Sequence, residues 1–302
     1  MTFAWLWVVF TLIAALLQTA RNTMQRQLTG PLGAVGATHV RFLFGLPFAI
    51  VFLAIVTLVT GLAIPAPNAA SLGWTMLGAM TQIVATALML AAMRERSFVT
   101  TIAYTKTEPV QAAIFGLIFL GDRLTPLLTL AIAIATTGVM VMSTPGKEAA
   151  APAGERRSLR APAMGLAAGG FFALSAIGFR GGVLALEAPN FVIAATTTLV
   201  TGLAMQTATL TLYLIVADRP TLAAILRLWR PSMKAGLAGA AASQFWFLGF
   251  ATASAAQVRT LALVEVILAQ IVSKRFFSQG ASARELAGMA LIVLGVAVLL
   301  NA

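Results

Sequence analysis

The 302-residue sequence contains no cysteine and a single histidine, His39. Disulfide bonds, thiol catalysis and cysteine-held metals are therefore excluded, and so is a metal site built from several histidines. We accordingly expect no cofactor. Charge is also scarce, because 10% of the residues are charged, against about 25% in an ordinary soluble domain.

What the chain has in abundance is apolar sequence. Hydrophobic residues make up 60% of it, and the mean hydropathy is +0.93. Since about 20 apolar residues are needed to cross a bilayer core of about 30 Å, the long apolar blocks predict an all-α polytopic membrane protein with ten transmembrane helices. The predicted spans are residues 3–20, 36–60, 72–93, 98–120, 125–144, 163–186, 191–216, 235–254, 260–277 and 286–301.

The net charge of +11 is concentrated between the apolar blocks. This placement favours loop charges that set membrane topology over a nucleic-acid partner, since no basic stripe with interleaved aromatic residues occurs. Only Arg123 and Arg259 lie at even-numbered connections, and Lys106 and Arg180 lie within spans. The remaining basic residues lie in or beside odd-numbered connections, which places these in the cytoplasm and both termini outside. No basic segment precedes the first apolar block, so we expect a retained helix and not a signal peptide.

The chain shows signs of internal duplication. Residues 145–162, rich in proline, alanine and charge, separate a first set of five predicted helices, residues 1–144, from a second set, residues 163–302. The spacing of Glu108, Asp122 and Gly138 recurs as Glu265, Gln279 and Gly295. Because five is an odd number of spans, the two copies would lie inverted in the membrane, as in many transporters.

The segment Thr101–Thr125 is apolar enough to span a membrane, yet it contains Lys106, Glu108, Pro109 and Gln111. Charged groups in hydrocarbon are costly, so such residues usually face a cavity or a partner. One interpretation is the lining of a polar path. The other is ion pairing that only locks helix packing, and it requires partners from other helices, because residues two apart on a helix do not face each other.

Several residues of this segment are candidate ligands for a substrate or coupling ion. Glu108 would lie near the middle of the bilayer, where it could bind an amine group or take up a proton. Lys106 could offset the charge of Glu108 or bind a substrate carboxylate. Tyr104 and Gln111 would share a helical face with Glu108.

The second half offers Glu265 as the counterpart of Glu108, at a shallower depth that also suits an interfacial role. Polar or amphipathic side chains in other spans are further candidates for a small organic solute, although each could equally be a helix-packing residue: Gln82, Gln244, Trp246 and, more weakly, Gln18.

Four other ionisable residues are predicted to have topological roles. Arg21 and Arg180 lie near predicted span ends and are expected to reach lipid headgroups. His39 and Arg41 are placed at the start of a peripheral second helix, in contact with lipid. The segment TLAAILRLWR, residues 221–230, is expected to form an interfacial helix.

The sequence resembles the drug/metabolite transporter superfamily in its ten-helix EamA-type bacterial branch. The resemblance lies in THVRFLFGLPF around Arg41, in EPVQAAIFGLIFLGDRLT, in LVEVILAQIVSKRFF and in GMALIVLGVAVLL. It implies two inverted EamA-like repeats in a bacterial inner membrane, with a central cavity lined by helices 1, 3, 4, 6, 8 and 9. The carboxylate usual after the fourth helix is Asp122, but the one usual after the ninth is replaced by Gln279. Many members keep both termini in the cytoplasm, whereas the loop charges favour the reverse.

The expected function is secondary active export of a small organic metabolite such as an amino acid, by alternating access with proton coupling, and not enzymatic catalysis. The partners would be a small-molecule substrate, the lipid bilayer and protons. A non-transporting scaffold or sensor subunit is the alternative, a passive facilitator is a variant within transport, and the oligomeric state stays open.

Overall fold

A computed structural model describes residues 5–95, 104–143, 160–267 and 283–302. Over these residues the chain is helical and contains no strand. Four stretches are long and apolar enough to cross a membrane, namely Leu6–Thr60, Ala69–Met93, Pro162–Ala185 and Phe191–Ala217. The helices are α1 (Leu6–Leu43), α2 (Leu46–Thr60), α3 (Ala69–Glu95), α5 (Glu108–Phe115), the π-helix η2 (Gly116–Leu120), α6 (Pro126–Ser143), α7 (Arg160–Ala185), α8 (Phe191–Ala217), α9 (Arg219–Arg227), α10 (Trp229–Thr252), α11 (Ala255–Leu261) and α13 (Ala283–Leu299). The predicted polytopic all-α class is confirmed.

The first predicted span was too short. The helix continues past residue 20 as α1 and bends at Pro31 and Gly33, where φ is +66°. Proline lacks the N–H that an inner helical turn needs, and glycine tolerates a positive φ. The second predicted span therefore consists of the end of α1 followed by α2. The predicted linker 145–162 lies largely outside the described residues, and its last residues, from Arg160 on, already belong to α7.

The expected short helix between the seventh and eighth spans is present as α9. Asp218 caps its N-terminus by accepting a hydrogen bond of 3.2 Å from the backbone N–H of Thr221. Ile225 is buried, whereas Leu226 and Arg227 are exposed. The helix is confirmed, and its contact with the membrane surface stays a prediction.

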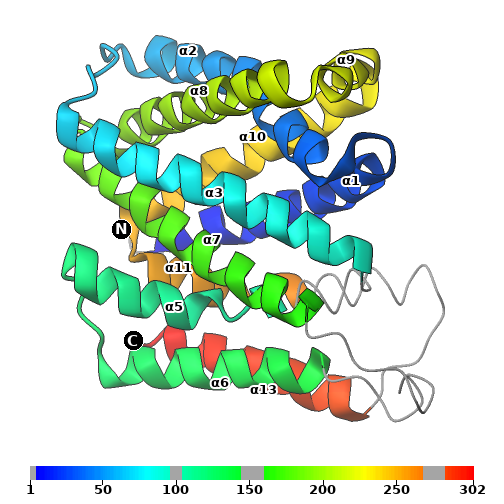
Figure 1. Cartoon of the computed structure of the whole chain (residues 1–302). Coiled ribbons are helices and arrows are strands. Elements are labelled where there is room, and N and C mark those ends of the chain that lie inside the picture. The colour runs from blue at the N-terminus through cyan, green and yellow to red at the C-terminus, as the bar shows by residue number, and fades with distance from the viewer. Residues whose placement is uncertain (1–4, 96–103, 144–159, 268–282) are drawn as a thin grey trace, which may run out of the picture.

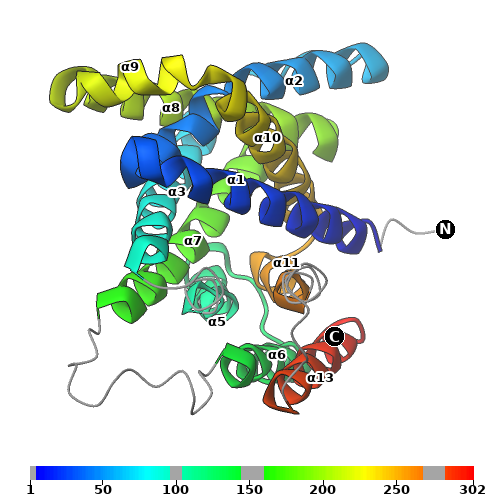
Figure 2. The same cartoon turned by 90° about the vertical axis from the view of Figure 1, so that its right-hand side faces the viewer.

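Three helix pairs form most of the bundle: α3 packs on α7, α1 on α10, and α6 on α13. Figures 1 and 2 show the α6–α13 pair set apart at the bottom, with α5 and α11 between it and the larger group of helices above. The buried layer between these groups holds the polar side chains described below.

The α6–α13 pair is held by small residues that allow close backbone approach. A Cβ on Gly138 would lie 2.8 Å from the backbone nitrogen of Ile292, and a Cβ on Gly295 would lie 2.7 Å from that of Ala135. The number of residues that separates Glu108 from Glu265 also separates Ala135 from Ile292 and Gly138 from Gly295. Each of the two contacts therefore becomes the other when the two halves are exchanged, as expected of two copies of one unit.

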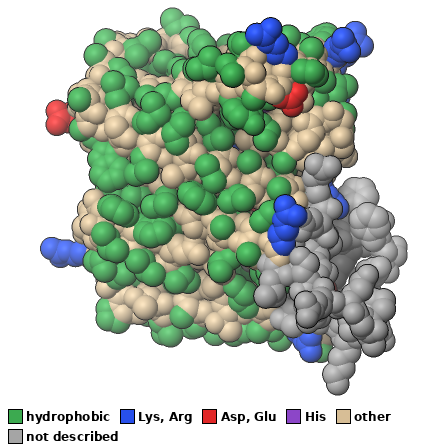
Figure 3. Space-filling view, viewed as in Figure 1, with side chains coloured by type: hydrophobic (Ala, Val, Ile, Leu, Met, Phe, Trp, Pro, Cys, Tyr) green, Lys and Arg blue, Asp and Glu red, His purple; other side chains and the backbone are tan. Residues whose placement is uncertain are grey.

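The two ends of the bundle differ in charge. In Figure 1 the C-terminus lies at the left end, whereas the ends of α3 and α6, the start of α7 and helix α9 lie at the right end. Most of the Lys and Arg side chains visible in Figure 3 gather at that right end. The described helix ends that flank the predicted third and fifth connections, and helix α9 in the seventh, thus lie at one end of the molecule.

The α3–α7 contact gives a direct test of packing. A Cβ on Gly78 would lie 2.8 Å from the backbone nitrogen of Phe179, whereas a Cβ on Gly73 of the same helix meets nothing within 4 Å. Gly78→Ala is expected to lower the free energy of unfolding by about 1–3 kcal/mol, because the backbones must separate. Gly73→Ala is the matched control and should be neutral or slightly stabilising. Equal effects of the two variants in SDS-titrated unfolding would contradict this packing.

Candidate functional site

The fourth predicted span is a broken helix. Tyr104 and Thr105 are helical, Lys106 and Thr107 form a turn, and α5 begins at Glu108. Pro109 at the first turn of α5 has no N–H to donate, which suits a helix start and not a helix interior. The helix is therefore interrupted at Lys106, directly before Glu108.

The ninth predicted span is broken at the corresponding place. Helix α11 begins at a capping box in which the Ser254 and Gln257 side chains each satisfy the other's backbone N–H. It ends at Leu261, a turn follows at residues 262–263, and helical structure resumes before Glu265. Broken helices with polar residues at the break are a recurrent feature of transporter sites.

Two buried ion pairs join these broken helices. Lys106 Nζ lies 2.5 Å from Glu265 Oε2, and Arg259 Nε lies 2.8 Å from Glu108 Oε1. All four residues are buried. Each carboxylate of one half is thus paired with a cation of the other half, so both pairs cross between the halves.

A polar network holds Glu265 in place. Gln18 donates a hydrogen bond of 3.1 Å to Glu265 Oε2, and Thr19 Oγ1 donates one of 3.3 Å to Glu265 Oε1. Gln18 in turn accepts a hydrogen bond of 3.0 Å from Trp246 Nε1. The Glu265 carboxylate is therefore bound directly by α1 and linked through Gln18 to α10.

Arg259 has aromatic as well as anionic partners. Its guanidinium carbon lies 4.4 Å from the centre of the Trp246 ring and 5.1 Å from that of Phe250. Both distances are within the range of a cation–π interaction. The aromatic faces and Glu108 together fix this cation at the second broken helix.

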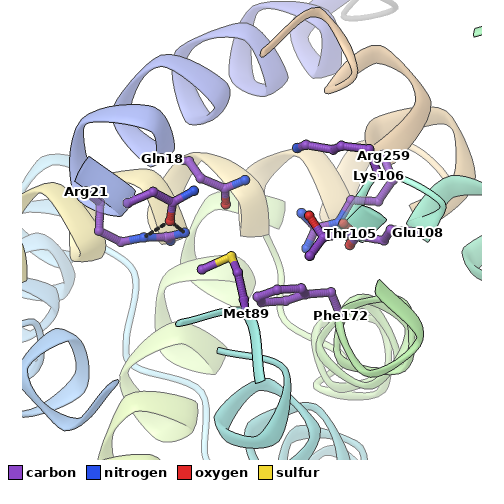
Figure 4. Close-up of a pocket in the computed structure, with 9 residues that line it drawn as sticks. Gln18, Arg21, Met89, Thr105, Lys106, Glu108, Phe172 and Arg259 are labelled. Atoms are coloured by element: carbon purple, nitrogen blue, oxygen red, sulfur yellow. Dashed lines mark hydrogen bonds and ion pairs between the residues drawn. The ribbon is translucent and has the colours of Figure 1, made fainter. Parts of the chain in front are cut away.

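A small cavity adjoins the ion pairs. Its free volume is about 20 Å³, room for one water molecule. In Figure 4, Gln18 lies between Arg21 on one side and Lys106 and Glu108 on the other, with Met89 and Phe172 below. An organic solute does not fit this space. The cavity is lined by Gln18, Arg21, Asn22, Met89, Thr105, Lys106, Glu108, Phe172 and Arg259.

Tyr104 and Gln111 lie against α7 and outside this lining. A Cβ on Gly165 would lie 2.6 Å from Cβ of Tyr104, and a Cβ on Gly170 would lie 3.0 Å from Oε1 of Gln111. The expectation that Tyr104 shares a helical face with Glu108 is wrong, because the turn at residues 106–107 separates Tyr104 from α5. Gln111 lies three residues after Glu108 within α5, and its contact with a solute stays a prediction.

The remaining amide candidates have partners of their own. Gln82 Oε1 accepts a hydrogen bond of 2.9 Å from Gln206 Nε2, and Gln244 Nε2 donates one of 2.8 Å to Thr196 Oγ1. Neither residue lines the small cavity. Their proposed contact with a solute stays a prediction.

Three residues that were assigned to lipid contact are instead buried. Arg21 is 1% exposed and lines the cavity, Arg41 is 2% exposed, and His39 is fully buried beside Thr211, with 3.0 Å between Nε2 and Oγ1. The expectations for these residues are wrong because α1 continues far beyond residue 20. Its middle and end therefore pack inside the bundle and do not reach its surface.

Arg180 was also expected at the headgroups, but it forms an ion pair. Arg180 Nη2 lies 3.3 Å from Asp122 Oδ1, and Nη1 donates hydrogen bonds to the carbonyl oxygens of Phe250 (2.8 Å) and Ala253 (2.5 Å). Arg180 thereby connects the turn after η2 to the end of α10. Gln279, the counterpart of Asp122, lies outside the described residues.

Arg259 was missed as a site residue because it was placed in a loop between two spans. The signal that could have found it is the sequence Ser254-Ala255-Ala256-Gln257. A serine followed three residues later by glutamine marks a helix start, which would have placed Arg259 inside the ninth helix.

Comparisons with known proteins agree with this fold. Residues 5–144 match the model of the EamA-like transporter family. One solved structure, described only as "Crystal structure of protein", has a TM-score of 0.69 and 15% identity, and the match covers 97% of this chain and 94% of that one. That likeness concerns the fold alone. No curated protein matches the sequence. Residues 5–144, a little under half of the chain, are thus similar to the EamA-like transporter family.

Proposed function

We propose that the protein is a secondary transporter for a small organic metabolite and that its substrate site lies at the two broken helices. The observation that carries the proposal is the pair of crossed ion pairs, Lys106–Glu265 and Arg259–Glu108, beside a small cavity. Residues 1–144 and 163–302 would be the two inverted units, and their relative motion would open the cavity to one side at a time.

The crossed ion pairs would determine when the two units can separate. Separating the halves leaves buried charges without partners, which is strongly unfavourable. A substrate that carries charged groups, or a proton taken up by Glu108 or Glu265, can replace the lost partner and lower the cost of opening. Ligand binding and conformational change are then coupled through the same side chains.

The finer details of the proposal come from the sequence. The sequence adds that the protein exports a metabolite such as an amino acid and couples this export to protons through Glu108. It also adds that the protein resides in a bacterial inner membrane with both termini outside. Loop charge supports the orientation, and an amino acid would offer one charged group to each sign of the site.

Alternating access can be tested because the natural chain has no cysteine. Met89→Cys places one thiol in the cavity lining, at a side chain that is 3% exposed. We expect a membrane-impermeant maleimide to label it from outside in intact cells and from the cytoplasmic side in inverted vesicles, because each state opens the cavity to one side.

Two exposed positions serve as controls: Arg123→Cys, at the turn before α6, and Arg227→Cys, on α9. Each should be labelled from one side only, Arg123→Cys from outside and Arg227→Cys from the cytoplasm. If Met89→Cys reacts from one side at most while both controls behave as expected, the protein does not alternate, and the scaffold or sensor alternative replaces transport.

A further inference from the structure

The core of the molecule contains more positive than negative charge. Among the described residues, four cationic side chains are buried, namely Arg21, Arg41, Lys106 and Arg259, but only two carboxylates, Glu108 and Glu265. The two crossed ion pairs use both carboxylates with Lys106 and Arg259. Two buried arginines therefore remain.

These two arginines lie next to each other. A Cβ on Gly239 of α10 would lie 3.1 Å from Cγ of Arg41 and 3.4 Å from Cδ of Arg21. Each of these two guanidinium side chains therefore has another cation as a near neighbour.

Neutral groups supply all the hydrogen bonds of the two guanidinium groups within the described residues. Arg21 donates to Asn22 Oδ1 at 2.7 Å, and Arg41 donates to Thr86 at 3.4 Å and to Ser243 at 3.3 Å. Arg21 Nη1 and Arg41 Nε are buried and have no hydrogen-bond partner among the described residues. Buried charge with unfilled donors is costly unless a counter-charge is supplied.

We infer that the substrate is an organic anion and that Arg21, supported by Arg41, supplies its counter-charge. The inference rests on the proposed transport function and names the substrate class. Arg21 lines the cavity, and a guanidinium binds a carboxylate or phosphate through two parallel hydrogen bonds. Two surplus cations accommodate up to two negative charges on the bound solute.

The apolar part of the lining indicates the rest of the substrate. Met89 and Phe172 face the cavity from the side opposite Gln18 (Figure 4). An anion with an apolar group would place its acid at Arg21 and its apolar part against these side chains. Since the cavity holds about one water molecule, the anion binds when the cavity widens.

Four probes that share a phenyl group and differ in charge test the inference: phenylacetate, phenylacetamide, phenethylamine and phenylalanine. The purified full-length protein is melted in detergent with each probe at constant ionic strength, with chloride as the common anion. A ligand that binds the native state raises its stability by RT ln(1 + [L]/Kd), where [L] is the free ligand concentration. We expect phenylacetate to raise the melting temperature by several degrees and the neutral and cationic probes to leave it unchanged.

The variants separate binding from folding. Arg21→Gln should abolish the phenylacetate shift, while its own melting temperature in the absence of probe should equal or exceed that of the natural protein, because a surplus buried charge is removed. Arg41→Gln should weaken the shift. Arg227→Gln, which removes an exposed arginine of α9, is the matched control and should retain it.

The outcomes are distinct. A phenylacetate shift that Arg21→Gln abolishes supports the inference. A shift with phenylalanine or phenethylamine but not with phenylacetate overturns the anion class and leaves transport standing. A phenylacetate shift that survives in Arg21→Gln overturns the role of Arg21. The absence of a shift with every probe overturns the inference, whereas transport itself is decided separately by the Met89→Cys labelling.

Discussion

Replacing Glu265 by glutamine is expected to lower the free energy of unfolding by about 3–5 kcal/mol, because it leaves Lys106 buried without a counter-charge. Lys106 Nζ lies 2.5 Å from this carboxylate, and both side chains are almost fully buried. The amide of glutamine fills the same volume and retains an acceptor for Gln18, so the loss reports on charge and not on packing. SDS-titrated unfolding in mixed micelles measures it.

A double-mutant cycle provides the control for this prediction. Lys106→Met alone leaves Glu265 charged and unpaired and should be destabilising by a similar amount. Lys106→Met combined with Glu265→Gln should recover most of the loss, because residues in direct contact are not additive. If the two single effects simply add in the double variant, the Lys106–Glu265 pair does not carry this stability.

Replacing Arg259 by glutamine is expected to have an effect of the same size, about 3–5 kcal/mol, because Glu108 then loses its cation. Lys106 cannot substitute while it is held by Glu265. Arg259→Gln also removes the cation from the faces of Trp246 and Phe250, which lie 4.4 Å and 5.1 Å away. Unfolding in SDS and the melting temperature in detergent measure the loss.

Arg259→Lys is the matched variant, because it keeps the charge but loses the flat guanidinium that stacks on the rings. We expect it to restore more than half of the stability lost in Arg259→Gln and to fall short of the natural protein by about 1–2 kcal/mol. A lysine variant as unstable as Arg259→Gln would show that ring packing matters more than charge. Full stability of Arg259→Gln would contradict the Arg259–Glu108 pair.

The sequence predicted the helices well because hydropathy over twenty residues is a strong signal. It also indicated Glu108, Lys106 and Glu265, because charge in an apolar block is conspicuous. Loop charge and the spacing shared by Glu108 and Glu265 further suggested two related units. These features are local or repeat along the chain, and no tertiary structure is needed to detect them.

The partners of these residues could not be predicted in the same way. Lys106 and Glu265 are far apart in sequence, and their meeting depends on how the two halves pack. Arg21 was assigned to the surface because the apolar run ends beside it, whereas α1 continues as a helix through Gln25 and Leu28. A helix can continue past the end of an apolar run when its polar residues are buried against other helices. Hydropathy does not report such burial.

The crossing of the ion pairs has a consequence for assembly. Each broken helix carries one cation and one carboxylate, but each of these charges is paired with a charge of the other half, Glu108 with Arg259 and Glu265 with Lys106. Each half produced as a separate polypeptide would therefore carry a cation and a carboxylate into the bilayer without their ion-pair partners, and coexpression would restore both pairs. A descendant of this chain in which the two halves became separate genes would be an obligate heterodimer, whose subunits must change their charges together.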